Sequence, residues 1–140
     1  SGGDIEEAHK LLRTKGFEAA TKRSEKTTNE GIIEAYIHGG GRIGAIVELN
    51  CETDFVARTD EFRSLAHDLA MQVAAMSPQY ISPDQFGDDD SFTPAQDSLL
   101  YQPFIKDQSR TINDLINDAR GKIGENIQVK RFVRFALGEE

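Results

Sequence analysis

Residues 31–50 read GIIEAYIHGGGRIGAIVELN, two runs rich in Ile and Val on either side of a glycine triplet. β-branched residues favour strands, and Gly39–Gly41 can adopt positive φ without steric cost, so the stretch predicts a β-hairpin. Side chains alternate between the two faces of a strand. The odd-numbered residues from Ile43 to Leu49 are therefore predicted to share one face, and the even-numbered residues the other.

Two amphipathic helices are predicted further along the chain. From about Asp60, apolar residues recur at steps of three and four until the Ser-Pro pair at 77–78 closes the pattern. A second helix is predicted to begin at Thr111, which forms a capping-box pattern with Asp114, and to end at Gly124.

The segment between these helices, residues 79–108, shows little periodicity. It holds three of the four prolines and the acidic run Asp88–Asp90. We expect a mainly irregular connection with short strand-like pieces at 80–81 and 103–105. The acidic run lacks the spacing and the closing Glu of a calcium loop, so it is predicted to be a solvated loop.

A last strand is predicted after Asn126. Alternation places one set of its residues on one face, namely Ile127, Val129, Val133, Phe135 and Leu137. The opposite face would carry Gln128, Lys130 and Arg134, with Phe132 as an apolar exception. Together with Ile46 in the hairpin, Phe132 predicts a second sheet face that is partly apolar and therefore suited to a partner.

A first helix is predicted before the hairpin, because apolar residues from Ile5 to Leu12 recur at near-helical spacing. Residues 1–3, Ser-Gly-Gly, are expected to be a cloning scar. The element order is then helix, strand, strand, helix, helix, strand. In a chain of 140 residues, this order predicts a single α+β fold, a small antiparallel sheet with helices on one face.

The composition argues against several classes of protein. The chain has 16 Lys and Arg against 24 Asp and Glu, a formal net charge of -8, whereas nucleic-acid binding needs clustered cations. Its one cysteine, Cys51, allows neither an internal disulfide nor a multi-cysteine zinc site. The longest apolar runs are far shorter than the roughly 20 residues of a membrane span. No cofactor, metal site or membrane contact is predicted.

Residues 50–58, NCETDFVAR, place carboxylates beside a large aromatic residue between a strand and a helix. One interpretation is structural: Phe55 and Val56 form a hydrophobic staple under the helix start. The other is functional: Phe55 projects from the connection and anchors a partner. The residues alone leave both interpretations open.

Enzymatic interpretations of the same region have weaker support. A hydrolase would draw on four nearby acids, Glu52, Asp54, Asp60 and Glu61. Acids at a helix start are expected from the helix dipole alone, so these four need no catalytic role. A thiol enzyme would pair Cys51 with His38 or His67, but both histidines fall on polar positions.

Two glycine-containing stretches resemble nucleotide-binding or RNA-binding motifs. The stretch Gly39–Gly44 lacks the Gly-Lys-Ser/Thr ending of a phosphate loop and is predicted to be a turn. GKIG at 121–124 matches the GXXG loop of KH domains, which makes an RNA-binding module the alternative function. The structural interpretation is a helix C-cap, with Gly121 tolerated for close packing.

Two blocks of the sequence resemble the translation elongation factor Ts family. IVELNCETDFVARTDEF at 46–62 is similar to the core of that family, and KIGENIQVKRFVRFALGE at 122–139 is similar to the end of the core. EEAHKLLRTKGFEAATKRSE at 6–25 resembles the last helix of the family's N-terminal domain and the basic linker behind it. The resemblance implies that residues 4–30 hold this helix and linker, and residues 31–140 the core domain.

The resemblance implies a guanine nucleotide exchange factor that promotes GDP release from the GTPase elongation factor Tu by binding, not by enzymatic chemistry. In the family, the TDFV motif enters the GTPase near its magnesium and phosphate site. Four residues match it here: Thr53, Asp54, Phe55 and Val56. A second contact is implied at Ile123 and Gly124 in the KIGEN turn.

The resemblance also carries expectations about assembly and location. The family's longer members hold two related halves in one chain and its short members pair two copies, so a homodimer is expected. Val133 occupies a position where some short members have a cysteine, which excludes a covalent dimer through that site. The expected location is the bacterial cytoplasm or an organelle matrix or stroma.

Overall fold

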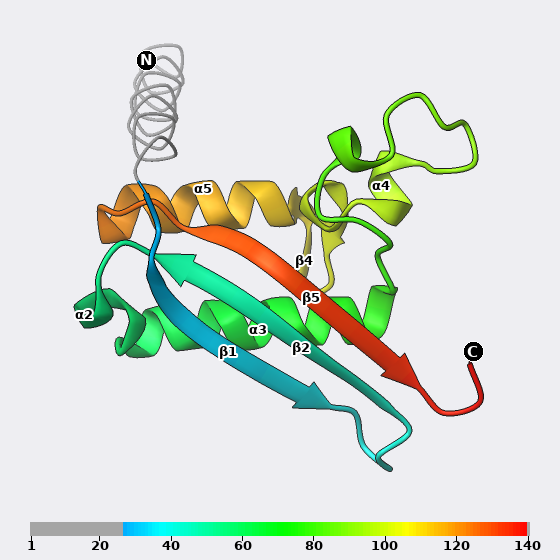
Figure 1. Cartoon of the computed structure of the whole chain (residues 1–140), viewed down its shortest axis with the longest axis horizontal. Coiled ribbons are helices and arrows are strands. Elements are labelled where there is room, and N and C mark those ends of the chain that lie inside the picture. Colours follow the sequence, from blue (N-terminus) through cyan, green and yellow to red (C-terminus); the bar gives the residue numbers. More distant parts are fainter. Residues whose placement is uncertain (1–26, 140) are drawn as a thin grey trace, which may run out of the picture.

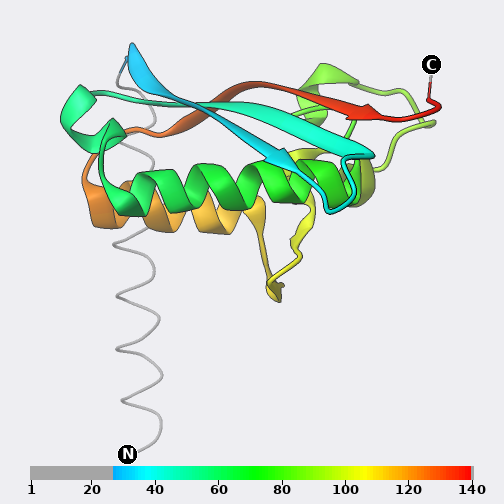
Figure 2. The ribbon, with the colours of Figure 1, turned by 90° about the horizontal axis from the view of Figure 1, so that it is seen from below.

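The chain folds into two layers, a sheet on one side and helices on the other. A computed structural model describes residues 27–139, and the helix expected before the hairpin lies outside them. The elements in chain order are β1 (Glu30–Ile37), β2 (Ile43–Cys51), α2 (Asp54–Ala57), α3 (Asp60–Met76), the 3₁₀ turn η1 (Pro83–Gln85), α4 (Pro94–Asp97), the 3₁₀ turn η2 (Leu99–Tyr101), β3 (Pro103–Phe104), β4 (Asp107–Thr111), α5 (Ile112–Ile123) and β5 (Gln128–Ala136). The strand order is β1-β2-β5 (Figure 1), and α3 and α5 lie on the same side of this sheet (Figure 2). The predicted α+β class is confirmed. No helix among residues 27–139 combines the length and the apolar character needed to cross a membrane.

The predicted hairpin is confirmed, with β2 as the central strand. β1 and β2 pair antiparallel around the glycine turn, where the His38 N–H donates to the Ile43 carbonyl at 2.9 Å. The predicted inner face of β2 is buried in the core through Ala45, Val47 and Leu49. The turn is a simple reversal, as predicted.

The alternation predicted for the last strand is wrong because β5 contains a β-bulge. Leu49 of β2 pairs with Val129, whereas Glu48 pairs with Arg131, so Lys130 is an extra residue on β5. A bulge shifts the two-residue period by one position, and every side chain beyond it changes face. The face assignments beyond the bulge are therefore reversed.

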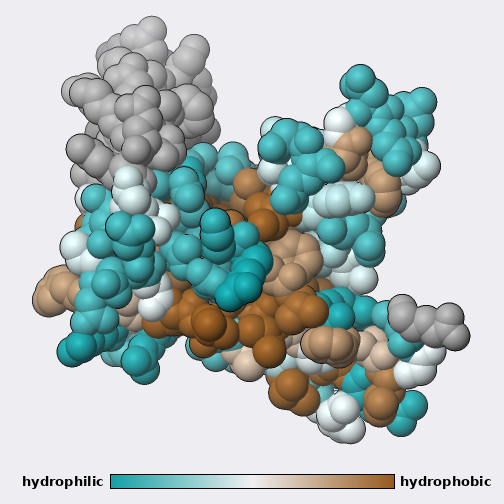
Figure 3. Space-filling view, viewed as in Figure 1, coloured by the Kyte–Doolittle hydropathy of each residue, from teal (hydrophilic) through white to brown (hydrophobic). Residues whose placement is uncertain are grey.

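The bulge changes which residues cover the core. Phe132 packs against the core, while Val133, Phe135 and Leu137 are exposed. The predicted second apolar face exists, but Val133 and Phe135 supply it together with Ile46. The strand registers define this open face, opposite the helices, as three cross-strand rows: Ile33, Glu48 and Arg131; Ala35, Ile46 and Val133; Ile37, Gly44 and Phe135. In Figure 3 it forms the central hydrophobic area.

α3 begins and ends at the predicted signals. Thr59 caps its N-terminus by accepting a hydrogen bond from the Phe62 N–H at 3.2 Å, and Asp60 and Glu61 lie in the first turn. Ser77 ends the helix with a left-handed φ of 50°. The buried apolar side of α3 consists of Phe62, Leu65, Ala66, Leu69, Ala70, Val73 and Ala74.

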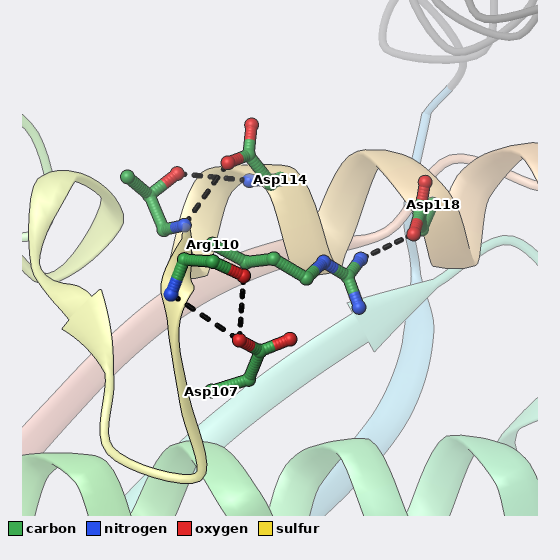
Figure 4. Close-up of polar contacts among 6 residues, drawn as sticks. Asp107, Arg110, Asp114 and Asp118 are labelled. Atoms are coloured by element: carbon green, nitrogen blue, oxygen red, sulfur yellow. Dashed lines mark hydrogen bonds and ion pairs between the residues drawn. The ribbon is translucent and has the colours of Figure 1, made fainter. Parts of the chain in front are cut away.

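α5 also follows its predicted caps. Figure 4 shows the capping box, in which Thr111 Oγ1 accepts from the Asp114 N–H at 3.1 Å and Asp114 Oδ2 accepts from the Thr111 N–H at 3.0 Å. Arg110 adds an ion pair with Asp118. Gly124 ends the helix at a φ of 86°, a conformation that glycine adopts without strain. The end of α5 is thereby fixed at the start of the KIGEN turn.

Residues 79–111 are more regular than predicted. The strand-like piece predicted at 103–105 is confirmed as β3, and the piece predicted at 80–81 is only an isolated bridge between Tyr80 and Ser98. The short helix α4 and the strand β4 were not expected, although Asp88–Asp90 is an exposed loop, as predicted. The buried Gln72 of α3 fixes this region: its Nε2 donates to the Pro103 carbonyl at 3.0 Å, and its Oε1 accepts from the Ile105 N–H at 3.0 Å. These contacts join residues more than 30 positions apart, so local periodicity gives no sign of them.

Gly31→Ala is expected to lower the free energy of unfolding by about 3 kcal/mol, because there is no room for a methyl group at this position of β1. A Cβ at residue 31 would lie 2.2 Å from the Leu49 carbonyl oxygen and 2.8 Å from the Asn50 Cα, and φ is 154°. Both neighbours are backbone atoms of the central strand. Urea unfolding of the two chains measures the change.

Gly39→Ala is the matched control, since a Cβ there meets nothing within 4 Å. The control is expected to unfold within about 0.5 kcal/mol of the original chain. Equal stability of the two variants would contradict the close approach of β1 and β2 at Gly31.

Candidate functional site

The connection between β2 and α3 holds a short helix, α2, that separates Phe55 from Val56. Val56 is 6% exposed and belongs to the hydrophobic core, whereas Phe55 is 81% exposed. Consecutive residues of a helical turn point about 100° apart, which lets Val56 face the core while Phe55 faces solvent. The staple interpretation is correct for Val56 and wrong for Phe55. Phe55 is left as a free aromatic ring on a short helix anchored by its neighbour.

Asp54 lies on the surface beside this ring. Its carboxylate pairs with Arg58 at 2.6 Å, and both side chains are more than half exposed. An exposed ion pair of this kind contributes little to stability. Asp54 is therefore available for a polar contact next to Phe55.

The KIGEN turn brings the second set of predicted residues to this end of the molecule. Ile123 is the last residue of α5 and is half buried, and Gly124 is the exposed C-cap. The GKIG stretch is therefore the end of a helix that leads into β5, not a loop between two helices. A Cβ at Gly121 would meet nothing within 4 Å, so the expectation that Gly121 allows close packing is wrong.

Two carboxylates join the α2 connection to the KIGEN turn. Glu125 Oε1 accepts hydrogen bonds from the Glu52 N–H and the Thr53 N–H, both at 3.0 Å, and its Oε2 accepts from Thr53 Oγ1 at 2.7 Å. Glu52 Oε2 accepts from the Asn126 N–H at 2.6 Å. We call this set the carboxylate bridge. Thr53 Oγ1 also accepts from the Val56 N–H at 3.3 Å as the N-cap of α2.

Sequence reasoning missed the carboxylate bridge. Glu52 and Glu125 are 73 positions apart, and no helical or strand period relates them. The only local signal was the position of Glu125 directly after the C-cap Gly124, where a chain reversal exposes a side chain to a neighbouring segment. The predicted binding residues of the two motifs are thus joined by side chains that were not predicted.

The enzymatic interpretations do not fit this geometry. The Glu52 carboxylate is engaged with the Asn126 N–H, and Asp60 and Glu61 lie in the first turn of α3. Cys51 pairs with Glu30 at one end of β1, whereas His38 follows the other end. In the part of the chain that the structure describes, no group of three or more His, Cys, Asp and Glu side chains could hold a metal ion.

The Cys51 thiol is buried under the α2 connection. It donates a hydrogen bond to the Thr53 carbonyl at 3.2 Å. Burial, together with the negative charge of Glu125, raises the pKa of Cys51 to about 11. An activated nucleophile needs access and a lowered pKa, so a buried thiol with a raised pKa does not fit the thiol-enzyme interpretation.

Alkylation of Cys51 by iodoacetamide at pH 8 is expected to be at least about a hundredfold slower in the folded chain than in urea. A thiol with a pKa near 11 is about a hundredfold less ionised at this pH than one with a pKa near 9, and burial restricts access further. The rate should continue to rise with pH up to about 11. Mass spectrometry follows the reaction, and a plateau near pH 9 in the folded chain would contradict the raised pKa.

The chain matches known proteins over most of its length. A family model described as elongation factor TS matches residues 5–93. The chain is 44% identical to elongation factor Ts of Moorella thermoacetica over 170 positions, covering 99% of this chain and 83% of the relative. It is 45% identical to elongation factor Ts of Methylacidiphilum infernorum over 168 positions, covering 100% of this chain and 84% of the relative.

A third relative gives the same result. Elongation factor Ts of Carboxydothermus hydrogenoformans is 44% identical over 169 positions, covering 99% of this chain and 78% of the relative. These alignments contain more positions than the 140 residues of the chain, so each relative has residues that this chain lacks. Because the family model covers more than half of the sequence and the relatives match nearly all of it, the chain belongs to the elongation factor Ts family.

Proposed function

We propose that this chain is a guanine nucleotide exchange factor that binds elongation factor Tu and speeds the release of GDP. Family membership supports a role in translation elongation. The observation that carries the specific proposal is Phe55, an 81% exposed ring on a short helix whose next residue is buried. Large exposed aromatic side chains on rigid supports are typical anchors of protein interfaces.

The proposed mechanism uses binding energy and no covalent step. Phe55 wedges between helices of the GTPase near its magnesium and phosphate site, and Asp54 holds the ring in that position. A bound nucleotide depends on Mg²⁺ and on the backbone N–H groups that surround its phosphates. A partner that binds best when these elements are displaced must weaken nucleotide binding, and the nucleotide weakens the partner by the same factor.

The other predicted binding residues take different parts in this proposal. Val56 is buried, so it supports Phe55 from below instead of contacting the GTPase. Thr53 caps α2 and sets its direction. Ile123 and Gly124 form the second contact, on the turn that the carboxylate bridge joins to α2. The core domain of residues 31–140 then presents both contacts at one end of the molecule.

The open face is the proposed surface of a homodimer. Its central row is apolar, with Ile46 at 42% and Val133 at 41% exposure. Phe135 extends the apolar area into one outer row, and the Glu48–Arg131 ion pair at 2.8 Å lies in the other. A contiguous apolar face on a sheet is typical of an interaction surface. A two-fold axis that runs parallel to β2, between the open faces of the two copies, would place the same rows of both copies against each other.

Release of labelled GDP from purified elongation factor Tu tests the exchange function. Addition of the chain at a concentration well below that of elongation factor Tu should accelerate release, and gel filtration should show a complex that GDP weakens. Filter binding to single-stranded RNA is the parallel measurement. RNA affinity with a steep salt dependence and no complex with elongation factor Tu would favour an RNA-binding module instead.

A further inference from the structure

Apart from the burial of Val56 and Ala57 and the hydrogen bond from the Cys51 thiol, the α2 connection is held by the carboxylate bridge. β2 ends at Cys51, so the N–H groups of Glu52 and Thr53 lie beyond the strand. Both N–H groups donate to a single oxygen of Glu125. α2 itself has four residues, far too few for a helix that is stable on its own. Its position therefore depends on its N-terminal hydrogen bonds and on the burial of Val56 and Ala57.

The negative charge of the Glu125 carboxylate is favourable at the N-terminus of α2. A carboxylate at the N-terminus of a helix interacts favourably with the partial positive charge there, and hydrogen bonds to a charged acceptor are stronger than neutral ones. Glu125 meets both conditions, because it bonds Thr53, the N-cap of α2, through two atoms. Glu52 completes the bridge in the opposite direction through the Asn126 N–H. Each segment thus supplies a carboxylate to the backbone of the other.

We propose that Glu125 and Glu52 are positioning residues that hold Phe55 and the KIGEN turn in the arrangement that elongation factor Tu binds. This role rests on the proposed exchange function. Neither carboxylate needs to touch the GTPase, because each acts through the backbone of the segment that does. A site that is already ordered loses less conformational entropy on binding, so loosening α2 and the KIGEN turn should lower the affinity for elongation factor Tu. Once the complex has formed, the partner itself holds the ring.

This role predicts a specific kinetic pattern. Glu125→Ala should raise the concentration of the chain that gives half-maximal GDP release by about tenfold, which corresponds to about 1.4 kcal/mol of binding energy. The maximal rate should stay within about a factor of two, because Phe55 is still present in the complex. A residue that acted in the displacement of the nucleotide would lower the maximal rate instead.

Cys51 gives a second measurement that needs no partner. It is the only cysteine of the chain, and its thiol donates to the Thr53 carbonyl directly beneath α2. Loosening of the α2 connection should expose this thiol while the rest of the fold stays intact. Alkylation of Cys51 by iodoacetamide at pH 8 should therefore be at least about tenfold faster in the Glu125→Ala chain, as expected for the loss of hydrogen bonds to a charged group.

Two further variants separate positioning from a general loss of stability. Glu125→Gln keeps an oxygen that can accept from the Glu52 and Thr53 N–H groups, so it should restore most of the native half-maximal concentration. Like Glu125→Ala, it lacks the charge that raises the pKa of Cys51, so it is the reference for alkylation: the faster reaction of Glu125→Ala over Glu125→Gln measures loosening. Ile112→Val removes one buried methyl group at the opposite end of α5 and leaves the bridge unchanged. It should lower the unfolding midpoint without accelerating Cys51 alkylation to the same extent.

The experiment measures alkylation and GDP release for the four chains side by side. Faster alkylation and a raised half-maximal concentration in Glu125→Ala, with recovery in Glu125→Gln, support the positioning role. Alkylation in Glu125→Ala no faster than in Glu125→Gln or Ile112→Val, or an unchanged half-maximal concentration, would overturn it. If the unmodified chain does not accelerate GDP release from elongation factor Tu, the proposed exchange function itself is wrong. Failure of the positioning role and failure of the exchange function therefore give different results.

Discussion

Phe55→Ala is expected to slow GDP release from elongation factor Tu at least about thirtyfold at a fixed chain concentration, with the thermal unfolding midpoint nearly unchanged. Loss of an interface anchor costs about 2 kcal/mol or more, which corresponds to about this factor in rate or affinity. The ring is 81% exposed, so its removal takes little from the core. The measurements are the release of labelled GDP and a thermal melt of the isolated chain.

Two matched variants define what this result means. Val56→Ala changes the adjacent buried residue and should lower the free energy of unfolding by about 1–3 kcal/mol. Tyr101→Ala removes another exposed aromatic ring, in η2, and should leave GDP release unchanged. If the Phe55→Ala chain is less stable but accelerates GDP release from elongation factor Tu normally per folded molecule, the ring stabilises the fold and is not an interface anchor.

The parts of the fold that follow local rules could be predicted from the sequence. The hairpin came from β-branched residues around a glycine turn, and α3 and α5 came from helical periodicity with recognisable caps. The capping box of Thr111 and Asp114 fixed the start of α5 to the residue. Caps and periods act over a few positions, so one sequence contains all the information they need.

The bulge in β5 could not be predicted because it depends on pairing with another strand. Residues 127–137 alternate well enough to suggest an uninterrupted strand. Only the register against β2 shows that Lys130 is extra. Its consequence is large, since it turns Phe132 toward the core and leaves Val133 and Phe135 on the open face.

The site shows the same division between local and long-range information. The resemblance to the family singled out the TDFV and KIGEN segments, but the residues alone left open whether Phe55 packs in the core or projects from it. That choice depends on the direction of α2, which is set by its N-cap Thr53 and by Glu125, the residue outside the segment that bonds Thr53. The contact that organises the site therefore joins two segments that are separate in the sequence.

Ile46→Glu is expected to convert a dimer of this chain into a monomer. Ile46 lies at the centre of the open face, between Ala35 and Val133 on the neighbouring strands. A dimer through this face would bury one unpaired carboxylate from each copy, at a cost of about 3–5 kcal/mol, enough to raise the dissociation constant about a hundredfold or more. Light scattering measures the change from about twice the 15.5 kDa chain mass to the chain mass itself.

Tyr101→Glu is the control for added charge, because Tyr101 is also partly exposed but lies in η2, outside the open face. It should leave the dimer intact.

α2 lies at one end of the sheet and not over the open face (Figure 2), so dimerisation would leave both Phe55 rings accessible. The Ile46→Glu chain should therefore accelerate GDP release from elongation factor Tu by the same amount per chain as the original. An unmodified chain that stays monomeric at high concentration would contradict pairing through this face, while an exchange rate that falls with dissociation would show that the second copy contributes to binding elongation factor Tu.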